Sequence, residues 1–320
     1  MRIFDEAQTR AALPFERLIP ALRARFAQGC EVPSRHVHEI AASDGAPGLT
    51  SLLMPAWIAG GCYGVKIVNI APANAARGLP GLHATYTLFD ATTGVPLALL
   101  DGGEITARRT AAASALAAQW LARTDACRLL VVGAGRVAAL LPDAYCAVRT
   151  IERVTVWARS VEKAQSLAAA WRTAGLDAES ASDLGAAVAA ADIVSCATLA
   201  TEPLVQGRWL APGSHLDLIG SFTPAMREAD DECFRGAALY VDTDEALAKS
   251  GDLLGPLSRG VFGAADVRGT LAQLARGGAS GRRDAVERTV FKSVGTALED
   301  LTAAMLAIDG PSPRASEDEG

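Results

Sequence analysis

The sequence predicts an α/β protein with a doubly wound parallel sheet in one domain and a mixed α+β arrangement in another. From about residue 128 to 242, short apolar runs alternate with alanine-rich helical stretches, which is the pattern of a parallel sheet covered by helices on both faces. Residues 1 to about 118 lack this alternation and contain two neighbouring β-type runs. A chain of 320 residues, half of them apolar, can bury a core for each domain.

The first domain contains a hairpin and ends in a long helix. In "YTLFDATTGVPLALLDGG", two β-type runs flank a turn between Asp90 and Gly94, which predicts a hairpin. A helix from about Thr106 to Ala122 contains no Gly or Pro and is expected to carry the chain into the second domain. We therefore expect the first domain to include residues 1–118 and the second to span residues 119–295.

The second domain opens with a buried strand and a glycine-rich turn. Arg128–Gly133 is a short apolar run, and the turn Gly133–Ala138 leads into a helix that reaches about Val148. The predicted elements that follow are a strand at Val154–Trp157, helices at Ser160–Trp171 and Leu184–Ala191, and strands at Ile193–Thr198, His215–Gly220 and Leu239–Asp242.

The turn "GAGRVA" is the Gly-x-Gly-x-x-Ala form of the dinucleotide-binding fingerprint. The glycines allow a tight turn and a close approach of the ligand to the backbone, and the N-terminus of the next helix can receive a pyrophosphate. The pattern is short, but it lies between a strand and a helix, which is the context that supports this interpretation. It predicts that Gly133, Gly135, Arg136 and Val137 bind a dinucleotide cofactor.

The end of the next strand indicates which dinucleotide is bound. An NAD site generally has an acidic residue here for the ribose 2′-hydroxyl, whereas this chain has Arg159 and Ser160 after Trp157 and Ala158. Arg159 could bind a 2′-phosphate, Ser160 could donate a hydrogen bond to it, and Lys163 would add positive charge. Ser160 is also suited to cap the following helix. We expect NADP(H) as the preferred cofactor, with NAD(H) possible.

Further candidate contacts with the cofactor lie at predicted strand ends and in the alanine-rich helix. The carboxyl ends of parallel strands are the usual ligand-binding edge of such a sheet. These candidates are Thr110, Thr198, Leu199, Ile219 and Ser221.

Composition restricts the other partners. The net charge is −6 and there is no basic run, which argues against a nucleic-acid partner. No apolar stretch approaches the length of a membrane span and the N-terminus has no signal-peptide core, so we expect a cytoplasmic protein with no membrane partner. Six cysteines without a CxxC pair and four histidines without HxxxH spacing predict reduced thiols and no metal site. The Pro-rich and charged tail after residue 309 predicts disorder.

Three cations of the first domain are candidates for binding a substrate. Lys66 lies within a β-type run, Arg109 opens the alanine-rich helix, and Arg35 follows Val32-Pro33-Ser34. Each of them alone is better interpreted as a surface charge. Their significance depends on the wider pattern of the chain.

That wider pattern consists of stretches that occur in a fixed order: "GVKIVN", "GLPGLHATYTLFDATTGVPLALLDGGEITARRTAAASALAA", "VVGAGRVA", "GSFTPAMREAD", "SGDLLGPL" and "TVFKSVGTALEDLTAA". Together, from about Arg35 to Ala307, they resemble the ornithine cyclodeaminase/mu-crystallin family. The resemblance implies a homodimer with a Rossmann domain and a substrate-binding and dimerisation domain, in which residues 296–320 join residues 1–118. It also implies that Arg35, Lys66 and Arg109 bind the substrate carboxylate.

The strand exit at Gly220–Pro224 departs from the pattern of that family's cyclodeaminases. Their aspartate at this exit transfers protons during loss of ammonia, whereas this chain has Phe222, followed by Ala225-Met226 in place of Gly-Lys. A phenyl ring cannot exchange protons. Phe222 and the resemblance therefore predict a ketimine reductase. Such an enzyme uses NAD(P)H to reduce a cyclic imino acid, Δ1-pyrroline-2-carboxylate or Δ1-piperideine-2-carboxylate, to L-proline or L-pipecolate.

The reduction also needs a proton. The candidate catalytic residues are Lys66, Arg109 and His83. Of these, His83 is the candidate proton donor, because the pKa range of histidine suits that role. Three alternatives stay open. One is an ornithine cyclodeaminase that uses Asp217, in the strand, or Glu228, on the helix expected after it. The others are an alanine dehydrogenase-like enzyme and a non-enzymatic, NADPH-dependent small-ligand binding protein of mu-crystallin type.

Overall fold

The computed structural model describes residues 1–42 and 48–310 and divides the chain into two compact units. The first unit contains Met1–Arg109 and the chain from Thr296 onward, and the second is Thr110–Gly295. The boundary after Arg109 and the predicted boundary after residue 118 both lie in helix α3 (Gly102–Leu121). The tail for which disorder is predicted lies outside the described residues from position 311 onward.

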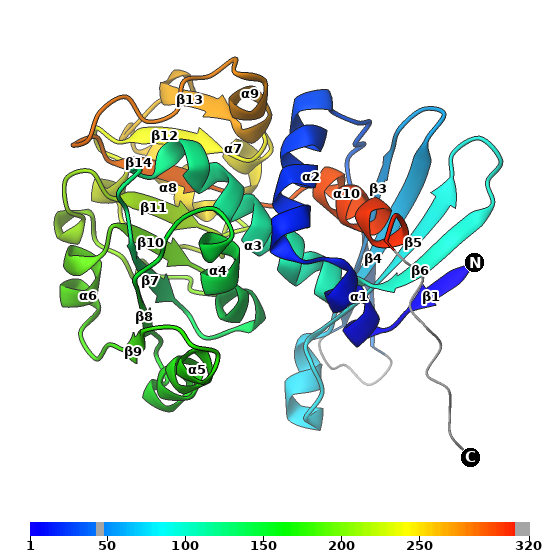
Figure 1. Ribbon diagram of the computed structural model, residues 1–320, viewed down its shortest axis with the longest axis horizontal. Coiled ribbons are helices and arrows are strands. Elements are labelled where there is room, and N and C mark those ends of the chain that lie inside the picture. Colours follow the sequence, from blue (N-terminus) through cyan, green and yellow to red (C-terminus); the bar gives the residue numbers. More distant parts are fainter. Residues whose placement is uncertain (43–47, 311–320) are drawn as a thin grey trace. The chain divides into compact units, whose positions relative to one another are not determined.

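The first unit is built on a six-stranded sheet (Figure 1). The strand order is β1-β6-β5-β4-β3-β2, in which β1 is parallel to β6 and all other neighbours are antiparallel. The mixed α+β arrangement predicted for this part of the chain is therefore confirmed. The strands are β1 (Arg2–Phe4), β2 (His36–Ile40), β3 (Leu49–Trp57), β4 (Cys62–Ile70), β5 (Leu82–Asp90) and β6 (Pro96–Asp101).

Strands β5 and β6 form the hairpin that the sequence predicts at Asp90. The Asp90 carboxylate accepts hydrogen bonds at Oδ1 from the backbone N–H groups of Thr92 and Thr93, at 2.9 and 2.7 Å. Gly94 has a φ of 71°, in the left-handed region that closes the turn. Aspartate favours turns because its short side chain bonds to the backbone just ahead of it. The turn fixes a register in which Tyr86 lies opposite Leu100.

One face of this sheet is covered by the C-terminal helix α10 (Ala297–Ile308), which contacts β3, β4 and β5 (Figure 1). Along β4, Gly64, Lys66 and Val68 are buried and Ile67 is exposed, as expected when alternate residues of a strand face a core. A charged residue, Lys66, therefore lies in the interior of this unit. The remaining helical segments are α1 (Glu6–Ala12), α2 (Phe15–Gln28) and the 3₁₀ segment η1 (Pro72–Arg77).

The second unit is built on an eight-stranded sheet in the order β13-β12-β14-β11-β10-β7-β8-β9, and every neighbouring pair is parallel. The chain runs outward from β7 to β9 on one side and returns to β10 on the other. This confirms the doubly wound prediction and places a topological switch point beside β7. The strands are β7 (Arg128–Val132), β8 (Arg153–Trp157), β9 (Ala178–Ser180), β10 (Ile193–Cys196), β11 (His215–Leu218), β12 (Ala238–Val241), β13 (Val267–Thr270) and β14 (Thr289–Lys292).

Helices cover this sheet (Figure 1). The central strands β10 and β11 are fully buried and β7 is buried after Arg128, which explains why apolar residues predominate in β7 and β10, whereas β11 also contains the buried His215 and Asp217. The α-helices are α4 (Arg136–Cys146), α5 (Val161–Thr173), α6 (Leu184–Ala190), α7 (Ala246–Lys249), α8 (Gly251–Ser258) and α9 (Leu271–Arg276). The 3₁₀ segments are η2 (Gly207–Trp209), η3 (Asp231–Cys233) and η4 (Ala264–Asp266).

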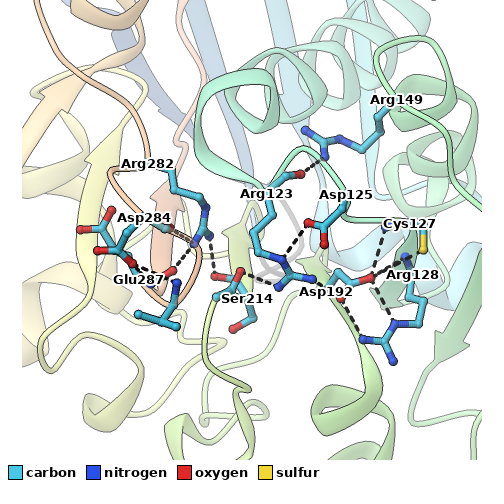
Figure 2. A network of polar contacts seen from close by, with 12 residues as sticks. Arg123, Asp125, Cys127, Arg128, Arg149, Asp192, Ser214, Arg282, Asp284 and Glu287 are labelled. Carbon is cyan, nitrogen blue, oxygen red and sulfur yellow. Dashed lines mark hydrogen bonds and ion pairs between the residues drawn. The ribbon is translucent and has the colours of Figure 1, made fainter.

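A polar network joins the amino ends of the strands in the second unit (Figure 2). Asp192, just before β10, accepts hydrogen bonds from the guanidinium groups of Arg123 and Arg128, both at 2.8 Å, and from the backbone N–H of Arg128. Burial opposes ionisation of Asp192, but the hydrogen bonds from Arg128 and Arg123 outweigh it and hold its pKa well below the usual range. The network therefore fixes the starts of β7 and β10, at the edge opposite to the glycine-rich turn.

Candidate active site

The glycine-rich turn after β7 has the geometry of a phosphate site. Gly133 has a φ of 123°, and a Cβ atom there would lie 2.5 Å from the carbonyl oxygen of Ala197, so this position requires glycine. An ideal Cβ on Gly135 would meet no atom within 4 Å, which leaves the outer side of the turn open. Ala138, the third position of the fingerprint, is fully buried and lets α4 pack closely on the sheet.

Helix α4 presents an uncapped N-terminus at this turn. Its N-cap residue is Gly135, which has no side chain that could accept from the first backbone N–H groups. These N–H groups belong to the candidate residues Arg136 and Val137 and to Ala138, and together with the helix dipole they favour an anion. A hollow of about 500 Å³ adjoins the turn and is lined by Ala134, Glu162, Lys163, Ser166, Leu167 and Ala170. The turn and hollow fit the pyrophosphate and adenosine ribose of a dinucleotide.

The first turn of α5, just after β8, contains an acid that the sequence reasoning missed. Ser160 caps α5, as one of the two interpretations expected, and accepts from the backbone N–H of Lys163 at 3.2 Å. Its hydroxyl donates to the Glu162 carboxylate at 2.8 Å. The side chains of Arg159, Glu162 and Lys163 are exposed. The two cations proposed for a 2′-phosphate therefore share this helix start with a carboxylate, and the signal was the Glu162 that directly precedes Lys163.

Two exposed apolar side chains mark the carboxyl ends of β10 and β11. Leu199 is 72% exposed and Phe222 is 41% exposed, although both lie directly beyond fully buried strands. Ile219 is 8% exposed and contributes mainly to packing. Isolated apolar residues on a surface are common, but here they lie at the ligand-binding edge of a doubly wound sheet. Leu199 and Phe222 are therefore available to contact the planar rings of a cofactor.

Ser221, predicted as a cofactor contact, is turned away from solvent. Its hydroxyl is fully buried and donates to the carbonyl oxygen of Met226 at 2.5 Å. It also lies 3.1 Å from the hydroxyl of Ser250 and accepts from the backbone N–H of Asp252 at 3.1 Å. These contacts use the hydrogen-bonding capacity of the side chain within the loop. The partners of the Ser221 side chain therefore belong to the protein, and the contact of this residue with the cofactor stays a prediction.

Glu228 does not lie on a helix, which corrects the sequence-based expectation. It belongs to an irregular segment between β11 and η3, and its carboxylate is fully buried. The carboxylate accepts at Oε1 from the backbone N–H and the hydroxyl of Thr198, at 2.7 and 2.8 Å, and at Oε2 from the N–H of Gly220, at 2.6 Å. Burial raises its pKa to about 8, against the opposing charge of Lys292. The candidate Thr198 is therefore held by Glu228.

Asp217, the other acid near this exit, lies within β11 as the sequence indicates. Its carboxylate accepts from the hydroxyls of Ser114 and Tyr145, both at 3.1 Å, and from that of Ser195 at 2.5 Å. Burial raises its pKa to about 6. These contacts commit the carboxylate to the interior of the second unit. Thr110, a further candidate on α3, is also nearly buried.

In the first unit, the structure brings together two of the three predicted substrate cations. Lys66 on β4 donates to Asp300 Oδ1 at 2.9 Å and lies 2.7 Å from Oδ2. Arg109 on α3 donates from Nε to the same Oδ1 at 3.0 Å and from Nη1 to Glu299 Oε2 at 2.6 Å. All four side chains are buried. Burial lowers the pKa of Lys66 to about 8, although Asp300 opposes this shift.

Glu299 and Asp300 are the residues of this cluster that the sequence reasoning missed. They come from α10 and lie 190 or more positions along the chain from the cations that they bind. The available signal was a pair of acids inside an apolar helical segment, "TALEDLTAA", because buried carboxylates are rare without a partner. Thr296 caps this helix and so fixes where it begins.

Arg35 and His83 occupy different places in the first sheet. Arg35 is half-buried and directly precedes β2, where His36 pairs with Leu53; one more step of this register would put Arg35 in the row of Met54 and Lys66. His83 is exposed and lies three residues before Tyr86, the cross-strand partner of Lys66. Successive strand residues alternate between faces, so His83 points away from the face with Lys66. The structure therefore does not bring His83 to Lys66 and Arg109 within this unit.

The fold and these sites define a class: a two-part α/β protein with a dinucleotide-type turn in one unit and a buried cation–carboxylate cluster in the other. Residues 16–311 match the ornithine cyclodeaminase/mu-crystallin family. The chain belongs to this family, as the resemblance predicted.

Named relatives of the chain cover most of its length. It is 43% identical over 294 residues to a Δ1-pyrroline-2-carboxylate reductase of Paracoccus denitrificans, which covers 91% of each chain. It is 35% identical over 301 residues to the mouse ketimine reductase mu-crystallin, again covering 91% of each. Among solved structures, it is similar to Thermococcus litoralis Δ1-pyrroline-2-carboxylate reductase in complex with NADH and L-proline, with a TM-score of 0.90, 32% identity and 97% of each chain covered.

Two further properties concern the described residues alone. No helix among them is long and apolar enough to cross a membrane. Within residues 1–42 and 48–310, no group of three or more His, Cys, Asp or Glu side chains is arranged to hold a metal ion.

Proposed function

We propose that this protein is an oxidoreductase that reduces the C=N bond of a cyclic ketimine 2-carboxylate with a nicotinamide cofactor. The substrates are Δ1-pyrroline-2-carboxylate, giving L-proline, and Δ1-piperideine-2-carboxylate, giving L-pipecolate. The observation that carries the proposal is the exit of β11, where Phe222 is exposed and the nearest acids, Asp217 and Glu228, are buried and hydrogen-bonded to protein groups. Two relatives named for such a reduction support it.

The chemistry divides between the cofactor and the chain. A bound nicotinamide would supply the hydride, while the protein has to hold the substrate and provide a proton for the imine nitrogen. Lys66 is the candidate proton donor, because burial lowers its pKa to about 8, close to the pH at which a general acid is most effective. His83 does not share this role within one chain, since it points to the opposite face of the sheet.

The substrate carboxylate would be held by Lys66, Arg109 and Arg35. Lys66 and Arg109 are balanced by Glu299 and Asp300, so this group of four is neutral when all are ionised. An added carboxylate would leave the group with a net negative charge. Arg35 would contribute a third cation to the binding of this carboxylate.

The cofactor proposed for this enzyme is NADP(H), with NAD(H) also accepted. Arg159 and Lys163 are exposed at the start of α5 and would bind a 2′-phosphate. Glu162 moderates this preference, because its carboxylate takes the hydrogen bond of Ser160 and would repel the phosphate. A weak rather than absolute preference for NADPH is the expected result.

We also propose that the protein forms a homodimer through the sheet face opposite α10. This face carries an aromatic row in which Tyr63 stacks on Phe89 at 5.5 Å and meets Trp57 edge-on at 6.4 Å. The neighbouring residue Ile67 is exposed on the same face. Aromatic residues are enriched at protein–protein interfaces, which supports this assignment. Sedimentation of the purified protein tests this assignment, and a monomer at micromolar concentration contradicts it.

A substrate panel tests the proposed function. The purified protein is assayed with NADPH and with NADH against the two cyclic ketimines, against pyruvate plus ammonia, and, in the oxidised direction, against L-ornithine. We expect turnover only with the ketimines. Activity with pyruvate and ammonia would support an alanine dehydrogenase instead, and cofactor binding without turnover on any substrate would support a small-ligand binding protein.

A further inference from the structure

The loops that follow β10 and β11 are joined by one buried carboxylate. Glu228 binds the loop after β10 through the N–H and hydroxyl of Thr198, and the loop after β11 through the N–H of Gly220. The two backbones approach closely here, since a Cβ on Gly220 would lie 1.9 Å from the carbonyl oxygen of Thr198 and 2.4 Å from Glu228 Oε1. Gly220 therefore has to be glycine for the carboxylate to reach both loops.

Two further buried charges hold the Glu228 segment in place. Asp252, at the start of α8, accepts from the backbone N–H groups of Glu228 and Ala229, at 2.8 and 3.1 Å. Lys292, at the end of β14, is fully buried, and its ammonium lies 3.6 Å from Asp252 Oδ2. Within the part of the chain that the structure describes, this ammonium makes no hydrogen bond. Its charge therefore acts at short range on both carboxylates and compensates a negative charge on Glu228.

The joined loops carry the exposed apolar residues of the candidate cofactor site. Leu199 directly follows Thr198, and Phe222 lies two residues after Gly220. Both side chains are solvent-exposed while the backbone beneath them is held by buried hydrogen bonds. A rigid support beneath exposed contact residues lowers the entropy that binding has to overcome.

We propose that Glu228 is a positioning residue that holds the loops after β10 and β11 in the arrangement that binds the nicotinamide cofactor. It contacts neither the cofactor nor the substrate and acts through Thr198 and Gly220. The inference rests on the cofactor assignment of the proposed function.

The chemistry of the contact explains why a carboxylate is required. Each of its two oxygens accepts a hydrogen bond from a backbone N–H group on a different loop, so both atoms at the end of the side chain have to be acceptors. A glutamine of the same length has one acceptor oxygen, so its amide nitrogen would face one of the N–H donors. One loop would then lose its partner and carry a buried, unsatisfied donor.

The test compares Glu228→Gln with a matched control in the same segment. Glu232→Gln makes the same chemical change at an exposed residue whose carboxylate contacts Arg235. Affinities for NADPH and NADH are measured by fluorescence titration, and hydrogen–deuterium exchange is followed in residues 197–204 and 219–228. We expect Glu228→Gln to raise both dissociation constants about tenfold or more and to speed exchange in these two loops, with Glu232→Gln unchanged. The KM for the ketimine stays within about twofold.

A pH series adds a readout that a purely structural role would not move. The ionisable groups near Glu228 are Lys292 on β14, Asp252 on α8 and Cys196 on β10. Because the pKa of Glu228 is raised to about 8, cofactor affinity of the wild type should increase as the pH rises from 7 to 9. This dependence should be absent in Glu228→Gln.

The outcomes separate this inference from the cofactor assignment. A folded Glu228→Gln protein with wild-type cofactor affinity overturns the positioning role. If the wild type binds neither NADPH nor NADH, the proposed function fails, and the exchange measurement still decides whether Glu228 holds the loops. If Glu228→Gln does not fold, Thr198→Val, which keeps the side-chain shape and removes the hydroxyl contact, should weaken cofactor binding severalfold; unchanged affinity would contradict the role.

Discussion

Asp300 is the residue on which the buried cluster of the first unit depends. Its carboxylate contacts both Lys66 and Arg109, whereas Glu299 contacts Arg109. Burial opposes ionisation of Asp300, but the charges of Lys66 and Arg109 outweigh it and lower its pKa. One carboxylate on the last helix therefore orients both cations proposed to bind the substrate.

Asp300→Asn should reduce kcat/KM for the ketimine by roughly tenfold to a hundredfold, the value of one or two charge-assisted hydrogen bonds. The lost charge also removes an influence that raises the pKa of Lys66. Lys66 then loses its proton at a lower pH, so the alkaline limb of the pH–rate profile should move to lower pH. Glu299→Gln is the comparison: Glu299 raises the pKa of Lys66 less than Asp300 does, so its alkaline limb should move in the same direction by a smaller amount. An unshifted limb in Asp300→Asn would contradict the assignment of Lys66.

We expect the exposed charges at the start of α5 to decide the cofactor preference. Arg159→Asp should raise the KM for NADPH at least tenfold, about 1.4 kcal/mol, with little change or an improvement for NADH. Glu162→Gln provides the opposite test. It removes a negative charge near the same position and should therefore lower the KM for NADPH. Steady-state kinetics with both cofactors measure these changes. A wild type that prefers NADH, together with an Arg159→Asp variant indifferent to NADPH, would rule out the 2′-phosphate site.

At the scale of elements, the proposed function assigns the choice of reaction to the exit of β11. Deamination of ornithine needs repeated proton transfers near this exit, and Phe222 supplies none. We therefore expect no ammonia from L-ornithine with catalytic NAD⁺ or NADP⁺, while both cyclic ketimines are reduced. Ammonia release is measured by a coupled assay. Ammonia release from L-ornithine on the order of one turnover per second, near typical enzyme rates, would contradict the reductase assignment. It would mean that a group other than residue 222 transfers the protons.

The sequence was informative about the elements where a local signal existed. Strands β7, β8, β10, β11 and β12 of the second unit were predicted to within about two residues, because most of them are short apolar runs, as expected of parallel strands buried on both faces. The strands β9, β13 and β14 were not predicted. The hairpin at Asp90 followed from turn chemistry, and Lys66 and Arg109 from the family pattern.

What the sequence did not reveal depends on contacts between distant segments. Glu228 lies in a stretch with helix-like composition that folds back under two strand ends, so local propensity was overridden by buried hydrogen bonds to Thr198 and Gly220. The Ser221 side chain likewise points inward because of buried hydrogen bonds, to Met226 and Asp252. Asp300 meets Lys66 across 234 positions of sequence, and no local pattern records that contact.

At the scale of the whole molecule, buried ionisable groups set how stability depends on pH. His215 in β11 is fully buried, and burial lowers its pKa to about 3. In the unfolded chain its pKa is about 6.5. Between these two pH values, His215 is protonated in the unfolded state and neutral in the folded state. The free energy of unfolding should therefore fall as the pH decreases from about 6.5 towards 3, by up to about 1.4 kcal/mol per pH unit.

This dependence can be isolated with His215→Asn, which cannot titrate. Other groups act in the same range: the pKa of Asp217 is raised to about 6, so its contribution has the opposite sign. The difference between wild type and variant removes such shared terms. Urea unfolding at pH 7, 6 and 5 should show a shallower loss of stability in the variant, by about 1.4 kcal/mol per unit below pH 6. Parallel curves for the two proteins would show that His215 titrates normally in the folded state.

The first unit is formed by two separate segments of the chain, and this has a consequence for folding during synthesis on the ribosome. Residues 110–295 form the second unit without a break, whereas the first unit waits for the segment that begins at Thr296. Until α10 leaves the exit tunnel, Lys66 and Arg109 lack the Asp300 and Glu299 carboxylates that bind them in the fold, and burying the two cations without these partners is unfavourable. Domains commonly fold as units during translation, so the part of the chain made first should be completed last. Limited proteolysis of stalled nascent chains should therefore find residues 110–295 protected before residues 1–109.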